Sequence, residues 1–452
     1  MSKVRILPAA SKLFGDIFCP PDKSFSHRAA MIGALSMGQT IIENFSFCQD
    51  TWSTLHCLEL LGVGVQARTD QSRVVIGSSG KDALTEPADI LDVGNSGTTL
   101  RMLAGITSGI QGLSILTGDQ SIRRRPMQRI IDPLRKTGII IGGRAQDKYA
   151  PLYLVGKNPL QAFQHTLKIP SAQVKSCLIF AALWGDGPSF IEEPIASRDH
   201  TENMLRAVGG DIRKKDGVIQ VFPGKELIAR SFYLPGDISS AAFLIAAALL
   251  VWGSHLIIRN LGLNPTRIGM IECLKRMGAK IEPFDVNEEW GEPRGHVIIE
   301  HSELNGFEIN QEEIPLLIDE IPILSVLATQ ASGCSIIKGA SELRVKESDR
   351  LQAISENLNS LGAQVKETED GLIISGPVTL KGGRVKSFGD HRIAMSMVIA
   401  GLIAESPIEI EDIDCISVSY PNFFQDLHNI GYRDFEFFPD NDIKNSSGKE
   451  KS

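Results

Sequence analysis

Five short polar clusters of the sequence combine lysine or arginine with small hydroxyl residues or glycine, and most run straight into an apolar stretch of helical length. In chain order they are residues 22–28, 94–101, 123–126, 346–350 and 389–392. The first turn of a helix presents free N–H groups and the positive end of the helix dipole, so cations placed there form local anion sites. The clusters therefore predict a small ligand with several negative charges.

Composition limits the class of partner. A formal net charge of −8 and a pI near 5.7 disfavour a nucleic-acid ligand, which needs a basic surface along its phosphates. The seven cysteines form no C-x-x-C pair, so they predict neither a metal site nor disulfides and fit a reducing cytoplasm. The longest apolar run, residues 241–252, is too short to span a bilayer, and the N-terminus lacks a signal-peptide core. We thus expect no membrane partner.

A repeat runs through the chain. Apolar residues, a glycine and a short β-like run recur six times, and an apolar helix-like run precedes each copy. The glycines are Gly62, Gly138, Gly209, Gly278, Gly362 and Gly431. Glycine is a common helix cap, so one match means little, but six matches in order favour a true repeat of helix, strand, helix and strand with left-handed glycine caps. An α/β architecture with three units in each half follows.

The chain is longer than one hydrophobic core usually supports, so two domains are expected. Pro20–Pro21 and Pro235–Gly236 interrupt the pattern and are the predicted crossovers. We therefore predict a discontinuous domain of residues 1–19 plus 236–440, an inserted domain of residues 20–235, and a disordered polar tail at 441–452. The ligand site is expected in the cleft between the two domains.

Each cluster also has a plainer interpretation. Lys23, Ser24 and Arg28 can reach one anion if a helix begins near Ser24, because residues four apart lie on one helix face. The segment could equally be a capped surface helix with an incidental basic turn. Residues 94–99 match neither a Walker loop nor G-x-G-x-x-G, and could be a simple turn. Three consecutive arginines end at Arg125, and because like charges repel, we expect at least one to face an anion.

Two acidic residues are candidates for proton transfer. Asp319 stands beside Glu320 in an apolar stretch that would raise its pKa unless a cation offsets the burial. Glu347 lies between Lys346 and Arg350, where it could serve as a second acid or form an i,i+3 helix salt bridge. A pair of such acids among cations suits an addition and elimination reaction.

Eight segments together carry a family resemblance. They are residues 22–28, 94–98, 125–127, 171–176, 197–202, 319–322, 346–350 and 389–395. Through them the chain resembles the 5-enolpyruvylshikimate-3-phosphate (EPSP) synthases, also called 3-phosphoshikimate 1-carboxyvinyltransferases. The resemblance implies two similar domains, each of three βαβαββ units, with the active site in the inter-domain cleft. It also implies transfer of the enolpyruvyl group of phosphoenolpyruvate to the 5-hydroxyl of shikimate 3-phosphate, without metal or organic cofactor, in a cytoplasmic monomer of the shikimate pathway.

The resemblance assigns site residues by position. For shikimate 3-phosphate it implies Lys23, Ser24, Arg28, Ser171, Ala172, Gln173, Ser197, Arg198, Asp319 and Lys346. For phosphoenolpyruvate it implies Lys23, Gly97, Arg125, Gln173, Arg350 and Arg392. Asp319 would take the proton of the 5-hydroxyl, and Glu347 and Lys23 are the candidates for protonating the methylene carbon.

Some positions depart from the family pattern. Pro21 and Phe25 replace a glycine and an aliphatic residue, which predicts a stiffer hinge, and residues 417–421 lack a lysine found in one branch. Glyphosate-tolerant members often carry alanine where this chain has Gly97, so an open inhibitor pocket is expected. The alternative enzyme is UDP-N-acetylglucosamine 1-carboxyvinyltransferase, whose reactive-loop cysteine corresponds to Gln120 here. A non-catalytic scaffold or an RNA-end-binding relative is disfavoured by the acidic pI and the ordered carboxylates.

Overall fold

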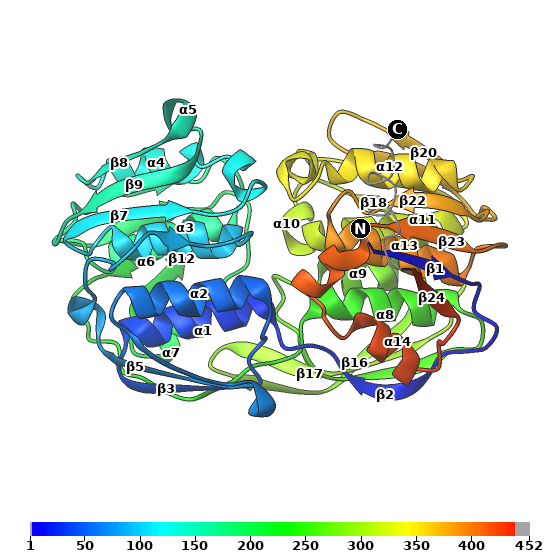
Figure 1. The fold of residues 1–452 in the computed structure, drawn as a ribbon, viewed down its shortest axis with the longest axis horizontal. Coiled ribbons are helices and arrows are strands. Elements are labelled where there is room, and N and C mark those ends of the chain that lie inside the picture. The colour runs from blue at the N-terminus through cyan, green and yellow to red at the C-terminus, as the bar shows by residue number, and fades with distance from the viewer. Residues whose placement is uncertain (1, 439–452) are drawn as a thin grey trace, which may run out of the picture.

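The computed structural model describes residues 2–438 and consists of two lobes side by side (Figure 1). One hydrophobic core draws its residues from 4–19 and 238–432, and the other draws them from 25–234. The predicted domain boundaries fall between these two sets and stay a prediction. The predicted tail, 441–452, lies outside the described residues. None of the helices between residues 2 and 438 is long and apolar enough to cross a membrane.

Six four-stranded sheets repeat one topology, and three belong to each lobe. In the sheet β6-β7-β9-β8, β6 (Leu91–Asp92) and β7 (Gly112–Thr117) are parallel, whereas β9 (Tyr149–Gly156) pairs antiparallel with β7 and with β8 (Ile140–Gly143). The other five sheets have the same pairing pattern. The predicted α/β fold of βαβαββ units is confirmed.

The remaining elements of the inserted lobe form two further sheets and their helices. Its sheets are β14 (Phe232–Tyr233), β3 (Met37–Glu43), β5 (Arg73–Ser79) and β4 (Gly64–Arg68), and β10 (Gln164–Thr166), β11 (Ser189–Glu192), β13 (Val218–Phe222) and β12 (Asp211–Lys215). Its helices are α1 (Lys23–Leu35), α2 (Gln49–Leu60), α3 (Gly97–Thr107), α4 (Gln128–Arg135), α5 (Arg144–Asp147), α6 (Ala172–Ala182) and α7 (His200–Ala207).

The other lobe is built in the same way. Its sheets are β16 (Lys280–Glu289), β17 (Glu292–Glu300), β15 (His255–Gly262) and β2 (Phe14–Phe18); β18 (Glu308–Ile309), β19 (Gly333–Ile337), β21 (Leu372–Gly376) and β20 (Gln364–Glu367); and β22 (Gly383–Lys386), β23 (Ile408–Glu411), β1 (Lys3–Ile6) and β24 (Phe435–Phe438). Its helices are α8 (Ile238–Leu250), α9 (Gly269–Arg276), α10 (Ile314–Leu317), α11 (Ile321–Gln330), α12 (Arg350–Ser360), α13 (His391–Leu402) and α14 (Phe423–Asn429).

The six repeat glycines all adopt left-handed backbone conformations. Their φ angles lie between 87° and 103°, and each follows the second helix of its unit, namely α2, α4, α7, α9, α12 or α14. Glycine reaches this conformation without the steric cost of a Cβ atom, so it ends the helix and turns the chain into the next strand. The predicted caps are confirmed at all six positions.

The first helix of each unit is buried, and side chains cap most of these helices. Asp22, Ser96, Ser171, Asp237 and Asp390 each accept a hydrogen bond from a backbone N–H in the first turn of their helix. Such caps leave the N-terminal ends of the helices polar while their sides are apolar, and burial of the sides fixes where the ends point. These ends meet at the space between the lobes.

The chain passes between the lobes twice, at neighbouring places. Pro21 and Gly236 form an antiparallel bridge, and the backbone N–H groups of Asp22 and Asp237 donate to the carbonyls of Pro235 and Pro20 at 2.9 and 2.8 Å. The two predicted crossovers thus support each other through backbone hydrogen bonds.

A hairpin provides a third link between the lobes. Strands β16 and β17 extend along the lower edge of Figure 1 toward the inserted lobe. At their turn, the Trp290 ring lies 6.0 Å from the ring of Phe25 and 5.2 Å from that of Phe232. Phe25, the unusual aromatic residue of the first cluster, therefore packs against the hairpin of the opposite lobe.

Candidate active site

A cavity of about 340 Å³ lies between the lobes and is lined by the first turns of α1, α3, α6, α8, α12 and α13. Every predicted site residue lines it: Lys23, Ser24, Arg28, Gly97, Arg125, Ser171, Ala172, Gln173, Ser197, Arg198, Asp319, Lys346, Glu347, Arg350 and Arg392. They come from both lobes and from segments far apart in sequence. The structure thus brings the predicted set together, while the role of each residue stays a prediction.

Asp319 lies among four cations. Its carboxylate oxygens are 2.6 Å from Arg198, 3.4 Å from Arg350, 3.6 Å from Lys346 and 3.8 Å from Arg392. Burial alone would raise the pKa of Asp319, but the four cations outweigh burial and hold this pKa well below its usual value. Asp319 is therefore ionised among these cations.

Glu347 joins the two lobes. Its carboxylate is 2.7 Å from Arg350 of the same segment and 3.2 Å from Arg125 of the inserted lobe. Burial raises the pKa of Glu347, but Arg350 and Arg125 hold it well below its usual value. The i,i+3 salt bridge considered from the sequence exists, and the contact with Arg125 adds a partner that the sequence did not indicate.

Lys23 is held by an acid that sequence reasoning missed. The Nζ atom of Lys23 donates to Asp50 at 2.9 Å, and Asp50 also lines the cavity. Burial lowers the pKa of Lys23, but Asp50 more than compensates and raises it. Asp50 lies in the first turn of α2. No sequence motif beside it marks it as a candidate site residue.

Two buried arginines of the cavity form no ion pair with a carboxylate among the described residues. Within residues 2–438, neither Arg28 nor Arg101 has an ion-pair partner; Arg28 donates to Thr201 at 2.8 Å, and Arg101 donates to Gln173. Burial and neighbouring arginines lower the pKa of Arg28 to about 10 and that of Arg101 to about 9. An uncompensated cation in a buried place marks where a ligand anion gains the most. Arg101 lies in a predicted cluster but was not among the predicted site residues.

A second pair of charges closes the cleft at its rim. Arg129 donates to Glu342 of the opposite lobe at 2.8 and 3.3 Å in a bidentate arrangement. Together with the pairs Arg125–Glu347 and Arg198–Asp319, it is one of several ion pairs that cross between the lobes around the cavity. Arg267 also approaches Asp22 of the other lobe at 3.8 Å.

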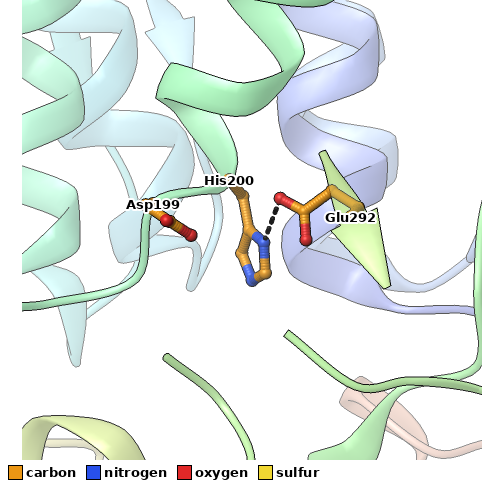
Figure 2. A group of neighbouring side chains, drawn as sticks. All are labelled: Asp199, His200 and Glu292. Atoms are coloured by element: carbon orange, nitrogen blue, oxygen red, sulfur yellow. Dashed lines mark hydrogen bonds and ion pairs between the residues drawn. The ribbon is translucent and has the colours of Figure 1, made fainter. Parts of the chain in front are cut away.

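Asp199, His200 and Glu292 lie close enough to suggest a metal site, as Figure 2 shows. Their carboxylates and His200 Nδ1 already have partners, however, although the buried His200 Nε2 has none among the described residues. His200 Nδ1 is 3.0 Å from Glu292, and the side-chain amide of Asn264 donates to Asp199 at 2.8 Å and to Glu292 at 2.7 Å. We interpret the group as a hydrogen-bonded link between the hairpin and α7 rather than as a cation site.

Comparisons with known proteins agree with this geometry. The family model for EPSP synthase (3-phosphoshikimate 1-carboxyvinyltransferase) matches residues 8–427. A 3-phosphoshikimate 1-carboxyvinyltransferase of Bacillus subtilis is 46% identical over 92% of this chain and 97% of its own length. The structure of an EPSP synthase from Acinetobacter baumannii superposes with a TM-score of 0.87 at 37% identity, covering 97% of this chain and 100% of the other.

The chain belongs to the EPSP synthase family. Similarity of this extent over nearly the whole length favours EPSP synthase over the alternative UDP-N-acetylglucosamine 1-carboxyvinyltransferase. The enolpyruvyl transferase NikO from Streptomyces tendae, at 16% identity and a TM-score of 0.77, shares the fold alone.

Gly97 lies close to two guanidinium groups. A Cβ atom added there would stand 3.1 Å from Arg101 Nη1 and 3.2 Å from Arg125 Nη1. We expect Gly97→Ala to displace these arginines and raise the KM for phosphoenolpyruvate about tenfold, with a smaller change in kcat. Steady-state kinetics with an unchanged melting temperature would check this.

Glyphosate should compete with phosphoenolpyruvate in the parent and bind more weakly to the variant; absence of competition at millimolar glyphosate would contradict the open pocket.

His27 links stability to pH. It is buried beside Thr54 Oγ1 at 2.7 Å, and burial lowers the pKa of His27 to about 3. Because the unfolded histidine has a pKa of about 6.5, the unfolded state binds the extra proton first, so stability is highest above that pH and falls toward the folded pKa. We expect His27 to cost about 1.4 kcal/mol of unfolding free energy per pH unit below about pH 6. Urea unfolding of His27→Gln should show a shallower loss than the parent between pH 7 and pH 5; equal slopes would contradict this.

Proposed function

We propose that this chain transfers the enolpyruvyl group of phosphoenolpyruvate to the 5-hydroxyl of shikimate 3-phosphate, releasing phosphate. The observation that carries the proposal is the gathering of all predicted site residues around one cation-rich cavity. The similarity of the whole chain to curated 3-phosphoshikimate 1-carboxyvinyltransferases supports the same activity.

The cleft is suited to bringing two anions together. Phosphoenolpyruvate and shikimate 3-phosphate repel each other in water, and a low-dielectric cavity would worsen this unless cations offset it. Arg28 and Arg101 supply positive charge that is not engaged in an ion pair with any carboxylate among residues 2–438, and they donate instead to Thr201 and Gln173. The other cations are paired with Asp319, Glu347 and Asp50, and substrate anions can replace these partners. Binding thus exchanges internal ion pairs for contacts with substrate.

This exchange gives Asp319 its proposed role. Its pKa is low because four cations surround it. When substrate phosphate and carboxylate groups draw Lys346, Arg350 and Arg392 toward themselves, the pKa of Asp319 rises toward the range of an effective base. Asp319 can then take the proton of the 5-hydroxyl while the hydroxyl oxygen attacks carbon 2 of phosphoenolpyruvate.

The donor side completes the reaction. A proton added to the methylene carbon by Glu347 or Lys23 makes carbon 2 electrophilic, and attack by the 5-oxygen gives a tetrahedral ketal phosphate. Loss of phosphate from carbon 2 and of one methyl proton then forms the enolpyruvyl ether. Contacts between the lobes that involve no predicted substrate-binding residue, such as the ion pair Arg129–Glu342, would hold the cleft closed, and closure would exclude water from the reacting carbon.

The test is phosphate release by the purified chain with phosphoenolpyruvate and either shikimate 3-phosphate or UDP-N-acetylglucosamine as acceptor, with EDTA present. We expect phosphate and an equal amount of enolpyruvyl ether with shikimate 3-phosphate alone. Release with the nucleotide sugar, or none with either acceptor, would contradict the proposal.

We further propose that the enzyme acts in the cytoplasm as a monomer. One chain supplies both walls of the cavity, so the site needs no second copy. Light scattering coupled to size-exclusion chromatography should give the mass of a single chain, 49.2 kDa. A dimer with full activity would contradict the proposed monomeric state but not the proposed reaction.

A further inference from the structure

A buried cluster of charges lies behind the cavity wall and has no role in the reaction described above. Its members are Lys175 of α6, Glu193 just after β11, and Glu202 of α7, whose side chains are 0–1% exposed. None of the three lines the cavity. Burying three ions is costly, and well-packed apolar residues often replace such clusters without loss of stability. The cluster therefore calls for an explanation beyond packing.

Glu193 fixes the loop that faces the acceptor site. Its Oε1 atom accepts hydrogen bonds from the backbone N–H of Ser197 at 2.9 Å and from the Ser197 hydroxyl at 2.5 Å. Lys175 approaches the same oxygen at 3.0 Å. A neutral side chain of the same size would accept these bonds less strongly, because bonds to an ionised acceptor are about twice as strong.

Lys175 binds the carbonyl side of Ser197. Its Nζ atom donates to the carbonyl oxygen of Ser197 at 3.1 Å and lies 2.9 Å from Glu202. Ser197 is thus bound at its N–H, its carbonyl and its hydroxyl, all by this cluster. The next residue, Arg198, reaches 2.6 Å from Asp319 across the cleft.

The arrangement also sets what Ser197 can offer a ligand. Its hydroxyl has one hydrogen, which is donated to Glu193, so toward a ligand this oxygen is left as an acceptor. A phosphate monoester dianion needs hydrogen-bond donors, and this loop supplies them through Arg198, which lines the cavity. The loop geometry therefore matters more for the acceptor than the serine hydroxyl does.

We propose that Glu193, secured by Lys175, is a positioning residue that holds Ser197 and Arg198 in the conformation that binds shikimate 3-phosphate. This inference rests on the proposed function, since it assumes that the loop at residues 193–199 contacts the acceptor. Glu193 acts through Ser197 and does not touch the substrate.

The experiment measures shikimate 3-phosphate binding by isothermal titration calorimetry without phosphoenolpyruvate. For Glu193→Gln we expect the Kd to rise about tenfold, as suits the loss of a charge-assisted hydrogen bond. Glu202→Gln is the matched control: it also removes a buried carboxylate beside Lys175 but leaves the contacts to Ser197. It should lower the melting temperature to a similar degree and leave the Kd within twofold. Equal Kd values for the parent and Glu193→Gln, or equal losses in both variants, would overturn the inference.

Two further variants keep the test decisive. Glu193→Asp retains the charge beside Lys175 but is too short to reach Ser197, so it should fold and still lose about tenfold in affinity. Ser197→Ala removes the hydroxyl but keeps the N–H contact to Glu193, so it should change the Kd less than Glu193→Gln does; a loss as large as that of Glu193→Gln would contradict a role through the loop backbone. If the parent itself fails to bind shikimate 3-phosphate, the proposed function falls along with the inference. If the parent binds and all variants match it, only the inference falls.

Discussion

Asp319→Asn is expected to lower kcat by about a thousandfold, which is the usual contribution of a positioned general base. The amide keeps the size of the side chain but cannot take the proton of the 5-hydroxyl. Because the carboxylate is the shared partner of Arg198, Lys346, Arg350 and Arg392, its removal leaves the cleft more positive. We therefore expect the Kd for shikimate 3-phosphate to stay the same or fall. Stopped-assay phosphate release and calorimetry measure the two quantities.

The neighbouring acid provides a matched control for this prediction. Glu320 is 1% exposed, hydrogen-bonds the Ser239 hydroxyl and does not line the cavity. Glu320→Gln therefore removes an adjacent buried carboxylate without touching the reacting groups, and its kcat should stay within a few-fold of the parent. A thousandfold loss in both variants would indicate disruption of this segment, and a nearly normal kcat for Asp319→Asn would exclude the base assignment.

The elements that the sequence predicted best are those with local signals. Each repeat glycine has a left-handed φ, and four of the five polar clusters contain a side-chain cap such as Asp22 or Asp390. Both features depend only on residues within one or two turns, so they are visible in one dimension. Because the caps also fix where the helices begin, they placed the predicted cations at the correct ends.

The features that the sequence did not reveal depend on contacts between distant residues. Three sheets are completed by strands from elsewhere in the chain, including the two-residue strand β14, which pairs with β3. Arg129 and Glu342 are 213 residues apart, and neither lies in a recognisable motif with the other. Asp50 becomes significant only when folding brings it to Lys23. The three residues of the buried cluster, Lys175, Glu193 and Glu202, have no motif in the sequence that predicts their contact.

The two candidates for protonating the methylene carbon differ in charge state. Asp50 raises the pKa of Lys23, so Lys23 carries its proton, whereas Arg350 and Arg125 hold the pKa of Glu347 low and keep it ionised. Both arginines are also predicted to bind phosphoenolpyruvate. When the substrate takes them, Glu347 loses its counter-charges in a buried place, its pKa rises, and it gains a proton at the moment when the methylene carbon is beside it. Proton uptake by Glu347 would thus be coupled to donor binding.

Glu347→Gln is accordingly expected to lower kcat by about a hundredfold to a thousandfold while the KM for phosphoenolpyruvate changes only a few-fold. Lys23→Met should instead raise the KM values of both substrates, because Lys23 is predicted to contact both. In deuterated water, reversible protonation by the parent places deuterium in the methylene group of unreacted phosphoenolpyruvate, which mass spectrometry detects.

That exchange tests the proton donor separately from ion pairing between the lobes. Glu342→Gln breaks the contact with Arg129, another pair across the cleft, and should keep kcat within tenfold and retain deuterium exchange. Glu347→Gln should lose the exchange together with kcat, since both require a proton on the same carbon. If Glu347→Gln retained full exchange and Lys23→Met lost it, the proton donor would be the ammonium group of Lys23. The pKa of Glu347 would then stay low in the complex with phosphoenolpyruvate as well.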